Sequence, residues 1–309
     1  MKKVLITGAT GFIGSHLVRE LICRNVEVYA LCNYDSPNLD RISGLENVHI
    51  IDGNMEELDR LPDKCNERNF DVFFHLAWKG ASGTLRQDCK TQLDNIVWSF
   101  QAAETAIKMK CKKIVITGTV CENQCDAIAE MTGFAASSYY LNSKKSAYEM
   151  VSAYCKQHQF PLVWCTFYHP LGIYNKKEQL LINTMMKLLS GEYLRFGKAG
   201  NWFDVIAVED LCRGLYLAGK HELKKDRYFI GSGTPRLLYE YLEEVKNMIN
   251  PNAKMHYGEY ENDNLPMKRE WLDVLPFQVE TGFQAEISFH DCVEQTLQWL
   301  KREMKAQQK

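Results

Sequence analysis

Tyr140 and Lys144 stand four residues apart in a segment with the apolar spacing of a helix. Residues at positions i and i+4 share one helix face, so the Lys144 ammonium lies beside the Tyr140 phenol. We expect this charge to lower the pKa of Tyr140 from about 10 toward neutrality. Such a phenol gives a proton to a carbonyl, or takes one from an alcohol, while hydride is transferred. Because YxxxK pairs also occur by chance on surface helices, the pair needs support from the rest of the chain.

Two further features supply that support. Thr119 follows a predicted strand upstream of Tyr140, where its hydroxyl can hold the same substrate oxygen or bond its own backbone. Near the start of the chain, glycines at Gly8, Gly11 and Gly14 separate a predicted strand from a predicted helix. This GxxGxxG spacing predicts a tight turn that brings a diphosphate to the helix N-terminus, where the amides of Phe12 and Ile13 face it. The combination predicts a nicotinamide dinucleotide cofactor.

The choice between NAD(H) and NADP(H) stays open. An acidic residue normally binds the ribose 2′-hydroxyl at the end of the second strand, but Cys32 stands there, without an adjacent arginine to favour a 2′-phosphate. Asp35 is one alternative ribose ligand. Asn33 and Ser36 are weak alternatives for a phosphate. We expect Asn54 and its neighbour Met55, which follow the third strand, to contact adenine.

The first half of the chain alternates short apolar runs with amphipathic segments. The runs predict strands at 3–7, 26–31, 47–51, 71–76, 113–117 and 162–167, and the amphipathic segments predict helices at 12–24, 87–109 and 138–157. Nearly continuous apolar runs are typical of parallel strands buried on both faces. The pattern therefore predicts an α/β protein with a Rossmann-type, doubly wound parallel sheet.

The regular alternation of predicted strands and helices ends after Pro170. The later pattern predicts helices at 178–191, 209–218, 237–249 and 288–305, a strand at 228–230 and a loop at 259–266. We assign residues 1–170 to a dinucleotide-binding domain, which can recruit strands from about 200–230. Residues 171–309 form mainly a smaller α/β substrate-binding lobe, placed over the carboxyl ends of the strands.

The bulk composition indicates a globular cytoplasmic protein. The 37 basic and 39 acidic residues give a net charge of −2, which does not favour nucleic acid or a membrane surface as a partner. The 11 cysteines show no CxxC pair, so we expect reduced thiols and no metal site. A strand beginning at Lys3 leaves no room for a signal peptide, and we find no apolar run of about 18 residues.

Together these motifs resemble the extended short-chain dehydrogenase/reductase family, specifically its sugar-nucleotide epimerase/dehydratase group. The matching segments span nearly the whole chain: Gly8–Gly14, His75–Ala77, Asn95, Thr117–Thr119, Tyr140 and Lys144, Pro170–Gly172, Val208–Asp210, Thr281–Phe283 and Trp299–Leu300. The resemblance implies a catalytic triad of Thr119, Tyr140 and Lys144, with Asn95 supporting the helix geometry. It also implies a nucleotide sugar bound under the lobe and a homodimer paired through two long helices.

Residue roles follow from the motifs and the resemblance together. The expected cofactor-binding residues are Gly8, Gly11, Phe12, Ile13, Gly14, Asn33, Asn54, Met55, Leu76, Ala77, Asn95, Tyr140, Lys144, His169 and Pro170. The expected substrate-binding residues are Trp78, Thr119, His169, Trp202, Lys198 and Arg269.

Several positions depart from the family pattern. The 4,6-dehydratases carry Asp-Glu directly after the catalytic threonine, but Val120 and Cys121 stand here and Glu122 comes one residue late. This disfavours a dehydratase. Phe203 replaces an arginine that clamps the substrate diphosphate, leaving Lys198, Lys268 and Arg269 as substitutes. His169 replaces an asparagine.

We therefore predict an NAD(P)-dependent oxidoreductase that reduces a keto group, at C4 of a nucleotide-linked deoxy- or amino-hexose. Losing the ribose acid at Cys32 removes a charge-assisted contact worth about 1.5–3 kcal/mol. A cofactor held less tightly suits a reductase, which must exchange it in each cycle. Two alternatives stay open: a nucleotide-sugar 4-epimerase with tightly bound NAD, and a non-catalytic regulator that senses a dinucleotide.

Overall fold

A seven-stranded sheet forms the centre of the protein in a computed structural model, which describes all residues except 134, 136, 260–264 and 307–309. The strand order is β11-β6-β5-β4-β1-β2-β3, and every neighbouring pair is parallel. The strands are β1 (Lys3–Thr7), β2 (Glu27–Cys32), β3 (Val48–Asp52), β4 (Val72–His75), β5 (Ile114–Thr117), β6 (Leu162–Thr166) and β11 (Arg227–Phe229). The strand order turns back at β1, because β2 and β3 are added on one side of it and β4, β5 and β6 on the other. This order confirms the predicted Rossmann-type fold.

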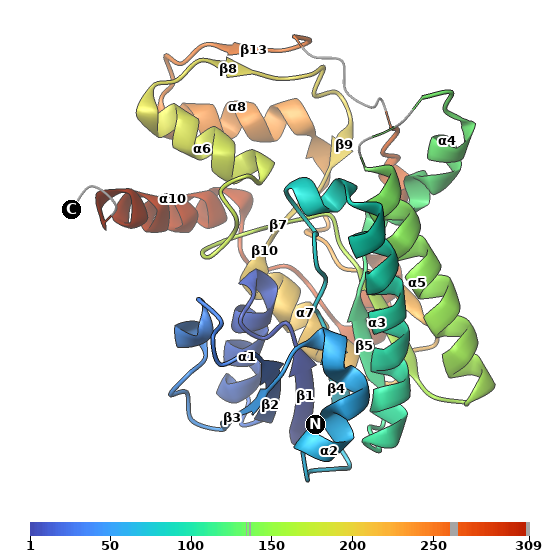
Figure 1. The fold of residues 1–309 in the computed structure, drawn as a ribbon. Helices are drawn as coiled ribbons and strands as arrows, with labels where there is room; N and C mark the ends of the chain where they lie inside the picture. Colours follow the sequence, from blue (N-terminus) through green and yellow to red (C-terminus); the bar gives the residue numbers. More distant parts are fainter. Residues whose placement is uncertain (134, 136, 260–264, 307–309) are drawn as a thin grey trace.

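Helices cover both faces of this sheet. α1 (Phe12–Cys23) and α7 (Val208–Lys220) pack on one face, and α2 (Leu61–Lys64), α3 (Cys89–Lys108) and α5 (Ser138–Gln157) on the other. Figure 1 shows α3 and α5 side by side along the sheet. Side chains alternate between the two cores: Val4 and Ile6 pack toward α1 and α7, whereas Leu5 packs toward α3 and α5. This alternation requires runs that are apolar at every position.

The second half of the chain builds a smaller lobe with its own apolar core. Its helices are α6 (Leu180–Ser190), α8 (Leu238–Ile249) and α10 (Phe289–Ala306), with short strand pairs β8 (Leu194–Arg195) with β13 (Met255–His256), and β9 (Trp202–Phe203) with β12 (Arg236–Leu237). A further parallel pair, β7 (His169–Leu171) and β10 (Val205–Ala207), lies between the lobe and the sheet. The lobe thus stands over the carboxyl edge of the sheet (Figure 1).

Short elements complete the chain around these layers. They are α4 (Cys125–Glu130), α9 (Leu275–Thr281), and the 3₁₀ turns η1 (Leu39–Arg41), η2 (Met55–Arg60), η3 (Thr84–Gln87), η4 (Val120–Gln124) and η5 (Arg269–Leu272). Most predicted elements agree within one or two residues. α9 and the two- and three-residue strands of the lobe escaped prediction, because they are too short to show a period. The predicted loop at 259–266 falls largely outside the described residues.

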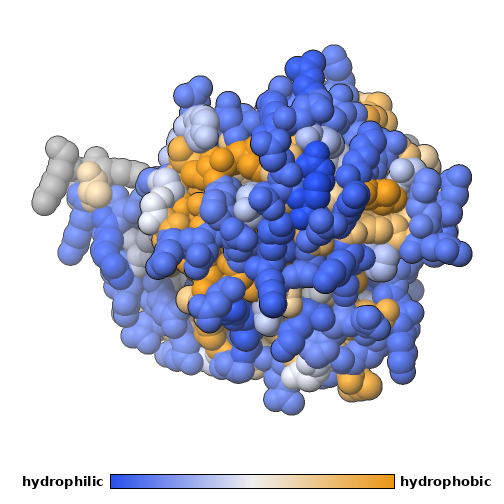
Figure 2. All heavy atoms as spheres, turned by 90° about the horizontal axis from the view of Figure 1, so that it is seen from below, coloured by the Kyte–Doolittle hydropathy of each residue, from blue (hydrophilic) through white to orange (hydrophobic). Residues whose placement is uncertain are grey.

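The surface on the side away from the lobe is mostly hydrophilic. Figure 2 shows this face, where hydrophobic residues appear in separate patches between charged and polar ones. Across the described residues, no helix is long and apolar enough to cross a membrane. All eleven cysteines are free thiols.

Candidate active site

The glycine loop between β1 and α1 is shaped by close backbone contacts. Gly8 has φ +75°, and a Cβ there would lie 2.8 Å from the backbone nitrogen of Ala77. A Cβ on Gly14 would lie 2.0 Å from the carbonyl oxygen of Gly8. Side chains at these two positions would therefore push α1 and the β4 loop away from the turn. The loop leaves the N-terminus of α1 open, because Gly11 offers no side-chain cap to its first amides.

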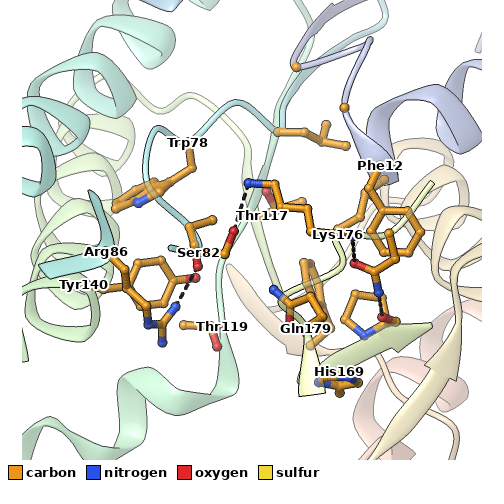
Figure 3. A pocket seen from close by; sticks show the side chains of 18 of the residues that line it. Phe12, Trp78, Ser82, Arg86, Thr117, Thr119, Tyr140, His169, Lys176 and Gln179 are labelled. Carbon is orange, nitrogen blue, oxygen red and sulfur yellow. Dashed lines mark hydrogen bonds between the residues drawn. The ribbon is translucent and has the colours of Figure 1, made fainter. Parts of the chain in front are cut away.

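A cavity of about 550 Å³ begins at this loop and runs under the lobe. It is lined by most residues of the predicted triad and cofactor set, and by Trp78 from the predicted substrate set: Gly8, Gly11, Phe12, Ile13, Gly14, Leu76, Trp78, Thr119, Tyr140, Lys144, His169 and Pro170. Figure 3 shows Trp78, Tyr140 and Arg86 on one side of the cavity and Phe12, Gln179 and His169 on the other. The fold therefore brings together motifs that are more than 160 residues apart in the chain.

Tyr140 keeps its proton in this cavity. Burial raises the pKa of Tyr140 to about 12, and the positive charge of Arg86 opposes that shift. The Arg86 guanidinium lies 3.7 Å from the centre of the Tyr140 ring, and the Trp78 ring meets it edge-on at 6.0 Å. The expected acidification of Tyr140 by Lys144 is therefore wrong in this structure, because desolvation has the largest effect on the phenol and Arg86 is the cation that opposes it.

Lys144 is buried one helical turn further along α5. Its Nζ donates to the carbonyl oxygen of Thr117 at 2.8 Å and lies 3.7 Å from the centre of the Trp78 ring. Burial lowers the pKa of Lys144 to about 7, with Glu122 opposing the shift and Arg86 adding to it. Since only one hydrogen bond is formed by Lys144 Nζ among the described residues, this group can donate to a further polar ligand in the cavity.

Thr119 lies at the end of β5, where it begins the turn η4. Its hydroxyl accepts the amide of Cys121 at 3.3 Å, and its own amide donates to the Glu122 carboxylate at 2.8 Å. Glu122 also accepts from the Trp164 indole at 3.2 Å and forms an ion pair with Arg227 at 3.1 Å. Glu122, which stands one residue later than the dehydratase carboxylates, is therefore bonded beneath the turn and does not line the cavity. Cys121 lines the cavity wall at this point.

His169 faces the cavity from β7. Its Nε2 atom is buried and has no hydrogen-bond partner among the described residues. Burial lowers the pKa of His169 to about 4, so the ring is neutral. A buried nitrogen without a partner costs free energy unless a ligand satisfies it, which marks this atom as a contact for cofactor or substrate.

Three predicted substrate residues do not line the cavity, and their role in substrate binding stays a prediction. Trp202 packs in a separate cluster with Phe229 and Met267, and the Arg269 guanidinium lies 5.0 Å from the centre of its ring. Lys198 is exposed on the lobe surface. Trp202 lies in the short strand β9, Lys198 precedes that strand, and Arg269 begins η5, so the predicted role of these residues rests on sequence position alone.

Five predicted cofactor residues also do not line the cavity. Asn95 is a correction: its amide bonds the backbone of Lys79 and Thr91, so it supports the loop after β4 and has no group left for a cofactor. The backbone of Ala77 lies against Gly8 of the glycine loop. The others are at the β2–β3 end of the sheet, where Asn33 is exposed, Asn54 accepts the amide of Glu56 at 2.7 Å, and Met55 packs against the apolar core.

The sequence did not single out some of the cavity's polar residues. Arg86 comes from η3 and donates to the carbonyl oxygen of Ala81 at 2.8 Å. Lys176 donates to Ser82 at 2.9 Å, and Ser82 donates to Glu178 at 3.2 Å, so two segments meet across the cavity mouth. The only signal in the sequence was that Arg86 follows the end of a strand at the ligand edge of the sheet.

A sequence model described as the NAD-dependent epimerase/dehydratase family matches residues 4–231. The chain belongs to this family. It is 23% identical to the dTDP-glucose 4,6-dehydratase of Haemophilus influenzae, over 97% of this chain and 98% of that protein. Its fold resembles the UDP-glucose 4-epimerase of Thermotoga maritima, with a TM-score of 0.77, 19% identity and coverage of 98% and 99%. A UDP-glucuronic acid 4-epimerase of Bacillus cereus, solved in complex with NAD, gives a TM-score of 0.74, 19% identity and coverage of 97% and 99%.

The residues present fit a nicotinamide dinucleotide. A Cβ on Gly8 or Gly14 would collide with the backbone that forms the glycine turn, the first amides of α1 have no side-chain cap, and the His169 nitrogen has no partner among the described residues. A diphosphate fits the positive end of the helix dipole. The nicotinamide end would then lie in the cavity lined by Tyr140 and Lys144.

Proposed function

We propose that this protein is an NAD(P)-dependent reductase of a nucleotide-activated keto sugar, acting at C4. The observation that carries the proposal is the geometry of one cavity, which brings together the buried Tyr140 phenol, the Thr119 hydroxyl and the Lys144 side chain, with burial raising the pKa of Tyr140 to about 12. A protonated phenol is the group that ketone reduction needs, because the new alcohol oxygen must receive a proton.

The roles of the side chains follow from this arrangement. A bound reduced nicotinamide supplies hydride to the carbonyl carbon. Tyr140 gives its proton to the carbonyl oxygen, and the Thr119 hydroxyl orients that oxygen by a hydrogen bond. Lys144 stabilises the phenolate left on Tyr140 and binds the nicotinamide ribose. Trp78 and His169, which line the same cavity, contact the sugar or the nicotinamide.

The wall beside Thr119 supports reduction over dehydration. Elimination of water needs a carboxyl pair next to the substrate, but Val120 is buried away from the cavity and Cys121 is a thiol. Burial raises the pKa of the Cys121 thiol to about 11, so it is a weak acid at neutral pH. Glu122 is held by Thr119, Trp164 and Arg227.

The test is a turnover assay with a nucleotide-linked 4-keto-6-deoxyhexose and added NADH or NADPH. We expect one equivalent of reduced cofactor to be oxidised for each alcohol formed. A 4-epimerase would instead carry stoichiometric NAD on purification and interconvert 4-epimers with none added. That result would contradict the reductase proposal, and so would an absence of both activities across sugar nucleotides, which would favour a regulator.

We also propose that the protein functions as a homodimer paired through α3 and α5. These helices pack against each other, and they carry large apolar side chains that face solvent in the single chain. On α3, Leu93 is 55% exposed and Val97 is 53% exposed; on α5, Met150 is 54% exposed. Leu93 and Val97 are one helical turn apart, so they form a continuous apolar strip.

A further inference from the structure

The loop after β2 folds back over the glycine loop. Ser36 donates to the Thr10 hydroxyl at 3.3 Å, and η1 then places the Arg41 guanidinium 3.3 Å from the Thr10 carbonyl oxygen. Thr10 belongs to the GxxGxxG turn itself. An arginine nine residues beyond Cys32 therefore reaches the phosphate-binding turn, although sequence position alone gave no arginine beside Cys32.

The Arg41 charge is not neutralised locally. Among the described residues, no carboxylate forms an ion pair with Arg41, and Asp40 and Glu303 act on it only through longer-range charge. The guanidinium is half-buried and lies 4.5 Å from the centre of the Tyr174 ring. The Arg41 carbonyl accepts from Arg19 at 2.9 Å, which fixes the backbone. A positioned, unpaired guanidinium is a binding group for an anion.

The end of β2, where an acid normally bonds the ribose 2′-hydroxyl, carries an uncharged residue here. Cys32 ends β2 beside the glycine loop, since Thr7 pairs with Leu31 across the two strands. Burial raises the pKa of the Cys32 thiol to about 11, so it carries no charge there. The carboxylate at the end of β3, Asp52, lies opposite Cys32, and one of its oxygens is occupied by the amide of Tyr34 at 3.1 Å.

We propose that this corner selects NADP(H) over NAD(H), with Arg41 and the hydroxyls of Ser36 and Thr10 binding the 2′-phosphate of the adenosine ribose. The inference rests on the proposed function, since it assumes a nicotinamide dinucleotide in the glycine loop. An acid at the end of β2 selects NAD(H) by bonding the 2′-hydroxyl, and a nearby arginine accommodates the 2′-phosphate. Here Cys32 stands in place of the acid at the end of β2, and Arg41 reaches the glycine loop.

Binding measured without turnover tests this directly. The dissociation constants of NADPH and NADH are measured by nicotinamide fluorescence for the wild type and for Arg41→Gln. We expect the wild type to bind NADPH at least about 10-fold more tightly than NADH. Arg41→Gln weakens NADPH by about 10- to 100-fold, the size expected for a lost charge-assisted contact, and changes NADH by less than about twofold. Arg60→Gln, which removes an exposed arginine from η2, is the matched control and changes neither constant.

A second variant tests whether an acid at the end of β2 reverses the cofactor preference. Cys32→Asp restores a carboxylate at the end of β2, and we expect it to weaken NADPH and strengthen NADH. Equal or tighter NADH binding by the wild type overturns the inference but leaves the reductase proposal intact. Equal weakening of both cofactors in Arg41→Gln also overturns it, because Arg41 then only braces the glycine loop through Thr10. If neither cofactor binds the wild type, both proposals fail.

Discussion

Tyr140 and Lys144 respond in opposite directions to the same burial. Desolvation penalises the charged form of each, so it raises the pKa of the phenol and lowers that of the ammonium. The proton that reduction needs is therefore kept on Tyr140, while Lys144 loses its proton readily near neutral pH. Burial therefore imposes a free-energy cost on the charged form of Lys144, which a bound ribose and a developing phenolate would relieve.

That cost predicts a pH-dependent stability of the cofactor-free protein. The pKa of Lys144 is about 7 in the folded protein against an ordinary value of about 10.5, so folding releases a proton between these limits. The destabilising effect is complete below pH 7 and declines as the pH rises toward 10.5. The wild type should therefore gain stability relative to Lys144→Met between about pH 7 and 8.5, before thiols titrate. Urea unfolding at several pH values measures this, and parallel curves for the two proteins would contradict it.

The positions of the candidate catalytic residues were easier to predict from the sequence than the residues that surround them in the cavity. Gly8, Thr119 and Tyr140 lie where their motifs place them, because each is tied to the end of a regular element. Arg86 comes from an irregular loop whose path depends on tertiary contacts, so no pattern marked it. Trp202 was expected in the site, but its direction is set by a two-residue strand that carries no periodic signal.

At the scale of elements, Asp210 connects α7 to the segment that leads into α10. One carboxylate oxygen accepts the amides of Glu286 and Ile287, both at 2.9 Å, and the other accepts from Arg213 at 2.6 Å. Asp210 is almost fully buried. These bonds fix the start of the last helix against the sheet half of the molecule.

Asp210→Ala should therefore destabilise the protein by about 2–3 kcal/mol, because two amides lose their partner in a buried setting. Asp210→Asn keeps one carbonyl acceptor and should cost less. Chemical denaturation measures both. Asp291→Ala, at the exposed first turn of α10, is a control that also removes a helix-start contact, the one with Ser288. A smaller loss for Asp210→Ala than for Asp291→Ala would contradict this role.

Element prediction succeeded where periodicity was long. α5 begins and ends at the predicted residues, and α3 begins one residue after its cap Asp88, whose carboxylate accepts the amide of Thr91 at 2.8 Å. The pair β7 and β10 was not predicted, since three residues cannot display alternation. Yet β7 carries His169 into the cavity. The lobe side of the cavity could therefore not be predicted from the hydrophobic pattern of the sequence.

At the scale of the whole molecule, the proposed dimer makes a clear prediction. Val97→Asp places a charge in the apolar strip of α3 and should convert the dimer into a monomer. The matched control is Val279→Asp on α9, where Val279 is 74% exposed and outside the proposed interface. Light scattering gives the mass of each. A monomeric wild type, or a Val97→Asp variant that stays dimeric, would contradict the proposed pairing.

The account as a whole depends on proton transfer from Tyr140 during hydride transfer. The most direct measurement is single-turnover oxidation of bound reduced nicotinamide by a nucleotide-linked 4-keto sugar, in the wild type and in Tyr140→Phe. The variant should bind both ligands as the wild type does, because only a hydroxyl is removed. Its hydride-transfer rate should fall by about 10²- to 10⁴-fold, the usual contribution of acid–base catalysis. An unchanged rate in a folded, fully loaded Tyr140→Phe protein would show that this phenol is not the proton donor.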